Sequence, residues 1–578
     1  MKIKITGNAS DACKELLKKH ISKRIDASFE VGGLEIRLAT DEALGKPESY
    51  SIAGDGDMWT VTGSDEKGLY YGIGKLLHSA VWTEDEFFPK PTDGVISPDC
   101  DFRCIYFSVH AFNWYFMAPT EDLEEYLEEM ILYGYNALHT IVPVFNIHQL
   151  DDDVFKESVK KNRAIFAAAK KVGLKTVFGV NPNQGLLSAP HEFDADLSYD
   201  TSDVGRYRGW AGRNLCPNKP GATEYLRNIW LKCLEQFTDI GIDYVITWPY
   251  DEGGCGCEKC APWGAGGFDK LSRLLAQDVR ELYPAAKFIY STWTFDVPGD
   301  QKEYSTLYKR LEAGEMDYVD YLMTDAHGAY PKFVLEHPLV RPIVSFPEIS
   351  MWGLFPWGGY GANPLPKRFE EIWDSAKGVL SGGDPYSEGL YEDISKIQFI
   401  GYFWNKNARY KDILREYASY EFGEDVADDA VRIMELIEVN HVGVYAAQQR
   451  CLENGGPAKE GDPISPDMPA AQEAYDLVMA ADSRMSELRK NSWRWRILYI
   501  RTVLDYKRYK AFFDRGMRQC YEDFHILRHD DEENQVLKND AGAQALYQEL
   551  RDIYHCLDHD NGRNKWTLPV VQGACHIK

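Results

Sequence analysis

The sequence has 578 residues, a length that suggests two to four domains. Its 64 basic and 90 acidic residues give a formal net charge of −26, which disfavours nucleic acid or an anionic membrane as a partner. No apolar run approaches the roughly 20 residues of a membrane helix, and the N-terminus lacks the apolar core of a signal peptide. Because the cysteines are mostly scattered singly, we expect a cytoplasmic protein, and nothing in the composition indicates its oligomeric state.

Residues 1–98 are expected to form a small α+β domain. Leu34–Leu38 and Trp59–Gly63 alternate polar and apolar residues as half-buried strands, and a turn-rich stretch, 53–57, lies between them. The segment Lys67–Leu77 then has apolar residues at helical spacing.

The end of the second strand and the start of this helix have the sequence VTGSDEKGLYYG, residues 61–72. This motif resembles the non-catalytic N-terminal domain of glycoside hydrolase families 20, 67 and 84. In those families the domain precedes a catalytic (β/α)8 barrel. The resemblance therefore implies such a barrel in the residues that follow.

Residues 99–410 alternate strand and helix patterns, as an α/β barrel requires, and eight strands over about 300 residues fit the usual length of a (β/α)8 TIM barrel. A doubly wound open sheet is the alternative, but it would normally have a Gly-rich phosphate loop where this chain has HAFNW, residues 110–114. Helical patterns such as Thr120–Tyr133, Val154–Val172 and Ala222–Ile240 lie between the strands. The expected strands are Arg103–Val109, Ala137–Val142, Lys175–Val180, Tyr244–Trp248, Phe288–Trp293, Tyr318–Met323, Ile343–Phe346 and Val379–Ser381.

Residues 411–578 are expected to form an α-helical domain. Val426–Asn440 and Ala470–Leu488 are amphipathic, and a longer patterned helix runs from Trp493 to Phe513. We expect the arginines of this last helix to pair with acidic neighbours, because the protein as a whole is acidic. The complete fold prediction is α/β: a TIM barrel with an N-terminal α+β domain and a C-terminal helical domain.

Within the barrel, the segment 243–254, DYVITWPYDEGG, predicts a buried strand that ends in two adjacent carboxylates. Barrels build active sites from carboxylates at the C-terminal ends of their strands, and glycosidic bond cleavage uses paired carboxyl groups. An acidic loop without function is the alternative. The pair, Asp251 and Glu252, resembles glycoside hydrolase family 20, although the residues before it differ from the family motif. That resemblance implies that Glu252 is a general acid and that Asp251 orients a 2-acetamido nucleophile of the substrate.

Two further carboxylates follow later strands. Glu348 lies in FPEIS, residues 346–350, and an acid after strand four with a nucleophile after strand seven is the arrangement of the retaining clan A glycosidases. Glu388 lies in YSEG, residues 386–389, after strand eight. Together with DEGGCGCEKC, this stretch resembles a bacterial group of barrel hydrolases related to family 20, which includes enzymes that act on N-acetylglucosamine linkages. The catalytic candidates are Asp251, Glu252, Glu348 and Glu388.

Aromatic residues are frequent, with 15 Trp and 35 Tyr. Sugar rings present C–H faces that stack on aromatic rings, and their hydroxyl groups need polar partners. A single Trp is more often a core residue, whereas a set at strand ends favours ligand stacking. The substrate-binding candidates are His110, Trp114, His139, Asn181, Trp248, Tyr250, Trp293, Trp352, Trp357 and Tyr386.

Cys255, Cys257 and Cys260 form a C-x-C-x-x-C motif directly after the carboxylate pair. Zinc sites use four N or S ligands, often with C-x2-C spacing, and Cys216 in the preceding strand–helix loop is the expected fourth ligand. The alternatives are reduced thiols or a disulfide, and a redox role is weaker because redox C-x-x-C pairs normally open a helix. We expect a structural zinc ion here and no cofactor for catalysis.

The sequence therefore predicts a glycoside hydrolase that cleaves a terminal sugar from a small oligosaccharide by carboxylate acid/base catalysis. The family resemblance implies a 2-acetamido sugar. Three alternatives stay open: a carbohydrate-binding barrel without turnover, a two-carboxylate retaining glycosidase for a non-acetylated sugar or uronic acid, and a metal- or redox-dependent enzyme at the cysteine loop. The sequence does not distinguish retention from inversion or identify the anomer.

Overall fold

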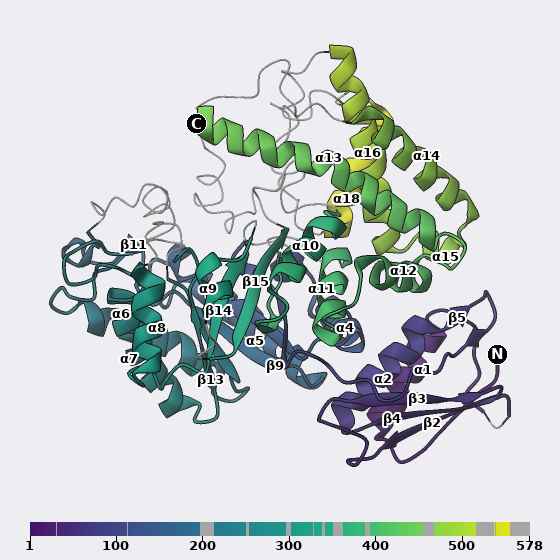
Figure 1. Cartoon of the computed structure of the whole chain (residues 1–578), viewed down its shortest axis with the longest axis horizontal. Coiled ribbons are helices and arrows are strands. Elements are labelled where there is room, and N and C mark those ends of the chain that lie inside the picture. The colour runs from purple at the N-terminus through teal and green to yellow at the C-terminus, as the bar shows by residue number, and fades with distance from the viewer. Residues whose placement is uncertain are drawn as a thin grey trace.

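The computed structural model describes residues 1–30, 32–111, 114–196, 213–249, 254–295, 302–326, 329–337, 341–350, 362–387, 393–454, 467–515, 537 and 539–554. Figure 1 shows three parts: a sheet with helices near the N-terminus, a central barrel enclosed by helices, and a group of helices formed by the later residues. None of the helices in the described ranges is long and apolar enough to cross a membrane.

The N-terminal part contains a four-stranded sheet in the order β1-β2-β4-β3, and α1 (Asp11–Ser22) and α2 (Glu66–Ser79) pack on it. Its strands are β1 (Ile3–Thr6), β2 (Leu34–Thr40), β3 (Tyr50–Asp55) and β4 (Met58–Gly63). A short hairpin follows, from β5 (Val81–Trp82) and β6 (Phe87–Phe88).

The predicted turn at 53–57 is wrong in its first half. Ala53–Asp55 belong to β3 and pair with β4, and only the two residues Gly56 and Asp57 form the hairpin turn. Small and acidic residues disfavour strands, but cross-strand pairing overrides that preference here. The helix prediction is confirmed, since Asp65 begins α2 by accepting a hydrogen bond from the backbone N–H of Gly68 at 2.7 Å.

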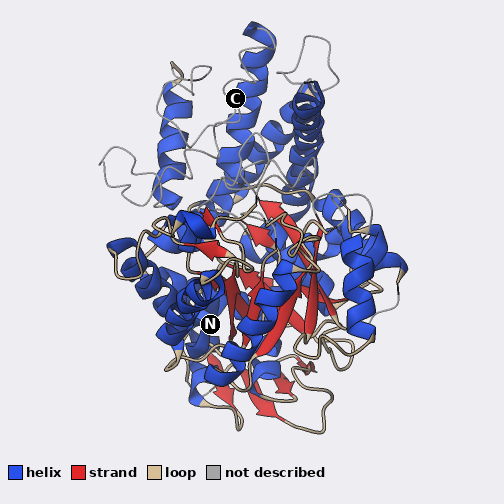
Figure 2. Cartoon of the chain, turned by 90° about the vertical axis from the view of Figure 1, so that its left-hand side faces the viewer, coloured by secondary structure: helices blue, strands red, loops and turns tan. Residues whose placement is uncertain are grey.

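Eight parallel strands close into a barrel, because β14 pairs with β15 and β16 pairs with β7. This closure confirms the TIM-barrel prediction over the doubly wound sheet. Figure 2 shows the strands at the centre with helices around them. The barrel strands are β7 (Phe102–Tyr106), β8 (Ala137–Ile141), β9 (Lys175–Val180), β12 (Tyr244–Thr247), β13 (Lys287–Ser291), β14 (Tyr321–Ala326), β15 (Ile343–Ser350) and β16 (Leu380–Gly383).

Three strand predictions need correction. The first strand ends at Tyr106 rather than at Val109, where a 3-10 turn, Val109–Ala111, begins. The sixth strand begins at Tyr321 rather than at Tyr318, because Val319 donates to the carbonyl of Met316 in a turn that is as apolar as the strand itself. The seventh strand continues to Ser350, four residues past its predicted end, because its extension pairs with β17 (Tyr386–Ser387). Glu348 therefore lies within a strand and not after one.

Alternate residues of the strands fill the barrel interior. Phe102, Cys104 and Tyr106 of β7 form one cluster with residues such as Tyr244 and Ile246 of β12. Because successive side chains of a strand point to opposite faces, the same alternation continues to the residues at the strand ends. The barrel interior is thus filled with side chains, and the space for a substrate lies at the C-terminal ends of the strands.

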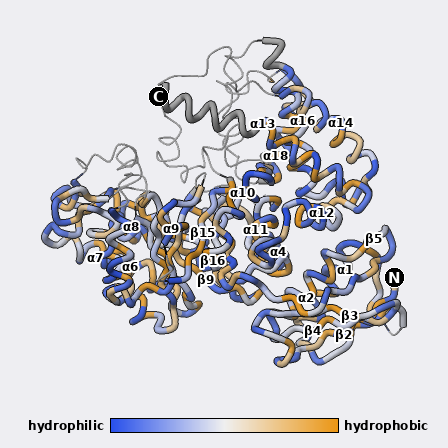
Figure 3. Tube along the Cα trace, in the orientation of Figure 1, coloured by the Kyte–Doolittle hydropathy of each residue, from blue (hydrophilic) through white to orange (hydrophobic). Residues whose placement is uncertain are grey.

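Most of the longer helices around the barrel bury one face, and Figure 3 shows polar and apolar residues alternating along them, whereas the last of them, Ile394–Trp404, is buried over nearly its whole surface. The prediction of Thr120–Tyr133 is confirmed, whereas the helix predicted at Ala222–Ile240 ends at Leu234 and continues as a 3-10 turn, Glu235–Phe237. The barrel helices are α3 (Trp114–Met117), α4 (Thr120–Tyr133), α5 (Asp153–Lys171), α6 (Ala222–Leu234), α7 (Gly267–Leu282), α8 (Lys302–Glu312), α9 (Lys332–Glu336), α10 (Pro366–Ala376) and α11 (Ile394–Trp404).

The later helices are α12 (Tyr410–Glu421), α13 (Ala427–Asn454), α14 (Met468–Arg484), α15 (Glu487–Lys490), α16 (Trp493–Arg515) and α18 (Ala541–Tyr554). The helix predicted at Val426–Asn440 is longer than expected. The expected pairing of arginines in α16 is confirmed. The Arg494 guanidinium contacts Asp393 at 2.5 Å and Glu129 at 2.7 Å, so its partners belong to the barrel side of the structure.

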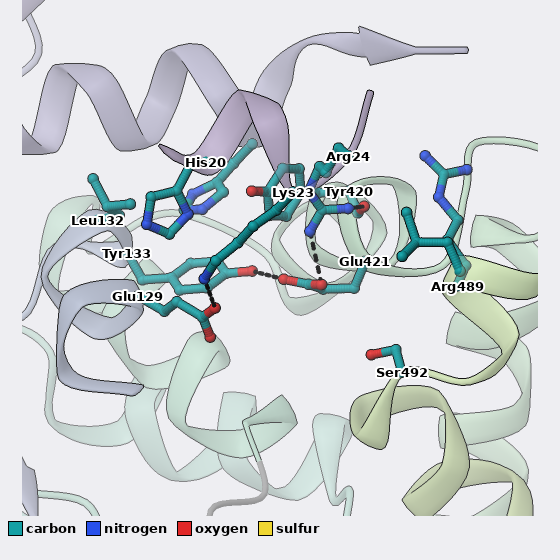
Figure 4. Close-up of a pocket in the computed structure, with 12 residues that line it drawn as sticks. His20, Lys23, Arg24, Glu129, Leu132, Tyr133, Tyr420, Glu421, Arg489 and Ser492 are labelled. Atoms are coloured by element: carbon teal, nitrogen blue, oxygen red, sulfur yellow. Dashed lines mark hydrogen bonds and ion pairs between the residues drawn. The ribbon is translucent and has the colours of Figure 1, made fainter. Parts of the chain in front are cut away.

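The three parts meet at a charged pocket between α1, α2, α4, α12 and α15, shown in Figure 4. Arg24 contacts Glu421 at 2.9 Å, Lys23 contacts Glu129 at 3.2 Å, and the Tyr133 hydroxyl donates to Glu421 at 3.0 Å. Although burial alone would raise it, the neighbouring cations lower the pKa of Glu129 to about 2. These charged groups pair with one another, so the pocket is a junction between parts of the chain.

Candidate active site

The site is built at the C-terminal ends of the barrel strands, where parallel strands bring distant residues together. Each strand supplies one or two side chains to this rim. They are Tyr106 and the following His110 (β7), His139 (β8), Asn181 (after β9), Trp248 (after β12), Trp293 (after β13), Asp325 (β14), Phe346 and Glu348 (β15), Asp384 (after β16) and Tyr386 (β17).

A continuous group of aromatic rings crosses the rim. The ring centroids are 5.7 Å apart for Trp293 and Trp248, 4.7 Å for Trp248 and Phe346, 4.9 Å for Phe346 and Tyr386, and 5.0 Å for Tyr386 and Tyr106. We call these five residues the aromatic belt. Three of its members are only half-buried: Trp248, Trp293 and Tyr386. These are the three belt residues that the sequence predicts as substrate-binding residues, and part of each side chain remains accessible.

His110 lies beside two hydroxyl groups of the aromatic belt. Its Nε2 lies 3.3 Å from the Tyr386 hydroxyl and its Nδ1 lies 3.4 Å from the Tyr106 hydroxyl. Burial, with a smaller contribution from the nearby His139, lowers the pKa of His110 to about 4. The ring is therefore neutral near pH 7, with one nitrogen that donates and one that accepts.

His139 and Asp384 form a buried pair beneath the belt. His139 Nδ1 lies 2.6 Å from Asp384 Oδ2, and the two residues are 2% and 0% exposed. The His139 ring meets Tyr106 edge to face at 4.5 Å, and its Nε2 has no hydrogen-bond partner among the described residues. A side chain at Gly179 would begin 2.7 Å from this nitrogen, so glycine leaves it room. The Asp384 carboxylate thus fixes the orientation of the His139 ring.

Two carboxylates face inward on neighbouring strands. Glu348 continues the inward alternation of Val344 and Phe346, is half-buried, and is paired in register with Tyr386. Asp325 continues the alternation of Met323 and is 4% exposed. Glu348 was predicted from the sequence. Asp325 was not, because the sixth strand had been placed three residues too early, and Asp384 was overlooked beside the better-known motif that follows it.

Six predicted residues lie outside the described ranges: Asp251, Glu252, Glu388, Tyr250, Trp352 and Trp357. The residues that flank the carboxylate pair are described. Trp263 donates a hydrogen bond to the carbonyl of Pro249, and a side chain at Gly254 would begin 2.2 Å from the ring of the same Trp. Both flanks of segment 250–253 are therefore anchored on one buried indole.

Two other candidates lie apart from the belt. Trp114 is 3% exposed, and its ring packs edge-on against Tyr115 and Tyr126. Asn181 donates to Gln184 and lines a pocket between the rim of β8 and β9 and helix α6. Trp114 is therefore a core residue, whereas Asn181 follows Val180, whose carbonyl accepts a hydrogen bond from the Trp248 backbone N–H at 3.1 Å.

The four predicted zinc ligands do lie together. The Sγ atoms of Cys216, Cys255, Cys257 and Cys260 are all within 4.8 Å of one another, and three of the residues are buried. Cys216 Sγ lies 3.7 Å from that of Cys257 and 3.8 Å from that of Cys260, and all four cysteines are free. A hydrogen bond from Cys260 lowers the pKa of Cys255 to about 5, and the same interaction raises the pKa of Cys260.

Sequence comparisons find no matching protein-family model and no matching curated protein. Many solved structures resemble the fold, among them the following three. A family GH115 4-O-methyl-α-glucuronidase, with specificity for decorated arabinogalactans, has a TM-score of 0.58 at 13% identity, over 95% of this chain and 76% of that chain. A family 89 glycoside hydrolase from Clostridium perfringens in complex with PUGNAc has a TM-score of 0.58 at 10% identity, over 94% of this chain and 64% of that chain.

A GH138 enzyme targeting pectin rhamnogalacturonan II has a TM-score of 0.52 at 14% identity, over 96% of this chain and 74% of that chain. At these identities the likeness shows the fold alone. The chain has the barrel architecture of these enzymes, with the additional parts on both sides included in the match.

Proposed function

We propose that the protein is a glycoside hydrolase that removes a terminal sugar from a small oligosaccharide. The observation that supports this most directly is the aromatic belt, which lies beside Glu348 and Asp325 at the end of the barrel where such folds place their active sites. A belt of half-buried rings with carboxylates at its edge suits a sugar, because its C–H faces stack and its hydroxyl groups accept and donate hydrogen bonds.

The charge of the rim favours a neutral sugar over an anionic one. The described rim carboxylates are Asp325, Glu348 and Asp384, and His110 is neutral because burial lowers its pKa to about 4. None of the rim residues named above is a lysine or an arginine, so a uronic acid would add a further negative charge to this described part of the rim. A solved structure of the family 89 enzyme contains its substrate GlcNAc-α-1,4-galactose, so a 2-acetamido sugar is compatible with this fold.

In this proposal Glu252 protonates the leaving oxygen. Two assignments of the nucleophile remain. Asp251 orients the 2-acetamido group, which itself attacks the anomeric carbon, or Glu348 attacks directly as a carboxylate. We favour the first because the adjacent carboxylates resemble family 20 and because a neutral acetamido sugar fits the acidic rim. Trp248 and Trp293 stack on the sugar in either case.

The test is a panel of aryl glycosides that includes N-acetylglucosaminides, glucosides and glucuronides of both anomers. We expect release of the aglycone from a 2-acetamido sugar and loss of that activity in Glu252→Gln. Glu258→Gln is the matched control, because Glu258 is an exposed glutamate six residues later in the same loop. Binding of sugars by the wild-type protein without release of any aglycone would instead support a carbohydrate-binding barrel.

A further inference from the structure

The four-cysteine group joins two segments that are far apart along the chain. Cys216 follows β11 (Arg213–Asn214), a short strand that pairs with β10 (Gln184–Gly185). The other three thiols lie in the loop between β12 and α7, which also contains Asp251 and Glu252. The shared thiol group is therefore a contact between this loop and the segment that precedes α6.

The sulfur positions fit a single tetrahedral ion. Zinc bound at 2.3 Å to four sulfurs places them about 3.8 Å apart. Cys216 Sγ lies 3.7 Å from the Cys257 sulfur and 3.8 Å from the Cys260 sulfur, and no pair in the group is more than 4.8 Å apart. Thiolates that bind different irons of a cluster would lie farther apart than thiolates that share one ion. A set of four thiolates also leaves no open position for water, as is usual for a structural site and not for a catalytic one.

The surroundings supply hydrogen bonds to the sulfurs. Asn218 Nδ2 donates to Cys260 Sγ at 3.0 Å, and the backbone N–H of Asp196 donates to Cys255 Sγ at 3.4 Å. The Asn218 amide is itself oriented, because its Oδ1 accepts from Lys270 Nζ at 3.0 Å. These donors and the lysine charge behind them favour negatively charged sulfurs, and such outer partners are typical of built metal sites.

We propose that Cys216, Cys255, Cys257 and Cys260 bind one zinc ion as thiolates, with release of the four thiol protons to solvent. The ion fastens the β12–α7 loop to the segment after β11. Gly256 already donates to the carbonyl of Asp196 at 2.8 Å across the same contact. Trp263 contacts both flanks of segment 250–253, and the zinc ion adds an attachment that begins at Cys255. The consequence for the carboxylate pair rests on the proposed function, whereas zinc binding does not.

The first experiment measures metal in protein purified without chelators or metal-affinity resin. We expect about one zinc and little iron per chain by mass spectrometry. Cys257→Ala removes the least buried ligand and should lose the zinc. Cys233→Ala is the matched control, because Cys233 is a buried thiol of α6 that does not belong to the group, and it should keep the zinc. Metal-free wild-type protein, stoichiometric iron, or full zinc in Cys257→Ala would overturn the assignment.

A second variant covers the case in which Cys257→Ala fails to fold. Asn218→Ala keeps all four thiols and removes the donor to Cys260, so it should weaken zinc binding by about 10–100-fold in a chelator competition. Unchanged affinity would count against the assigned site.

The fastening role is tested by hydrogen exchange of the peptide 254–266, which should be faster after zinc removal than in the loaded protein. Equal exchange rates would refute that role. None of these measurements needs a substrate, so they test the zinc site independently of the glycosidase proposal.

Discussion

Arg494 provides the sharpest test of how the helical part is held against the barrel. Its side chain is 6% exposed and contacts Asp393, which is fully buried, and Glu129, which is 21% exposed. Replacement by Met keeps an apolar side chain about as long as the aliphatic part of arginine, and it leaves Asp393 with the Tyr126 hydroxyl, 3.0 Å away, and the nearby charge of Lys396. Removal of one member of a buried pair typically costs about 3–5 kcal/mol of unfolding free energy, and we expect Arg494→Met to lose that amount.

Arg496→Met is the matched control on the same helix. Arg496 makes two contacts with Glu549, at 2.6 Å and 2.9 Å, but the two side chains are 18% and 36% exposed. Water already screens this pair, so its loss should cost about 1 kcal/mol or less. Urea unfolding followed by tryptophan fluorescence measures both variants against the wild type. Equal losses in the two variants would refute the reasoning from burial.

The same comparison has a defined pH dependence. Burial raises the pKa of Asp393, although Arg494 opposes the effect, so removal of Arg494 raises that pKa further. A carboxyl group with a raised folded-state pKa destabilises the fold above its unfolded pKa, and this penalty disappears as the pH falls and the group is protonated. The deficit of Arg494→Met should therefore shrink from pH 7 toward pH 4–5. A deficit that is constant over this range would show that the lost charge partner is not its cause.

Three further predictions concern the site. Glu252→Gln should reduce turnover of substrates with poor leaving groups by about 10²–10⁴-fold and of activated aryl glycosides much less, as steady-state kinetics can measure; equal losses would remove Glu252 from the acid role. If the acetamido group is the nucleophile, Asp251→Asn should reduce kcat far more than Glu348→Gln does. Substrates with a 2-hydroxyl group in place of the 2-acetamido group should then not be cleaved. A trapped glycosyl ester on Glu348 would reverse this assignment. Because the pKa of His110 is lowered to about 4, the folded state binds fewer protons than the unfolded state between pH 4 and 6.5. The unfolding free energy should therefore fall as the pH falls through that range, and it should fall less in His110→Gln. Identical pH profiles of the two proteins in urea titrations would contradict the neutral ring.

The barrel and much of its rim could be predicted because the signals are local. A buried strand followed by polar residues recurs eight times, and Trp248, Trp293 and Tyr386 follow or begin such strands. The cysteine group could also be predicted from the sequence, since three of its members form one motif and Cys216 lies in the corresponding loop of the preceding strand–helix unit of the barrel. Alternation within a strand then identifies the inward residues without knowledge of the neighbours.

The contacts made by barrel closure could not be predicted in this way. His139 and Asp384 are 245 residues apart, and their contact depends on how the last strand meets the first. Asp325 was missed for a different reason, because the apolar turn at Tyr318 and Val319 has the same composition as a strand. Only the ladder register of β14 with β15 places Asp325 opposite Phe346.

The charged junction in Figure 4 also has a consequence for the order in which the newly made chain can fold. Arg24 leaves α1 near the start of the chain, and its partner Glu421 is 397 residues later. At about 5–20 residues per second, translation needs roughly 20–80 s to deliver that partner after Arg24 has been made. During that interval the Arg24 guanidinium has the Trp82 ring of the N-terminal part, 5.9 Å away, as a neighbour but lacks its carboxylate partner. The finished junction is thus assembled late, when the N-terminal part docks onto a barrel that was synthesised after it.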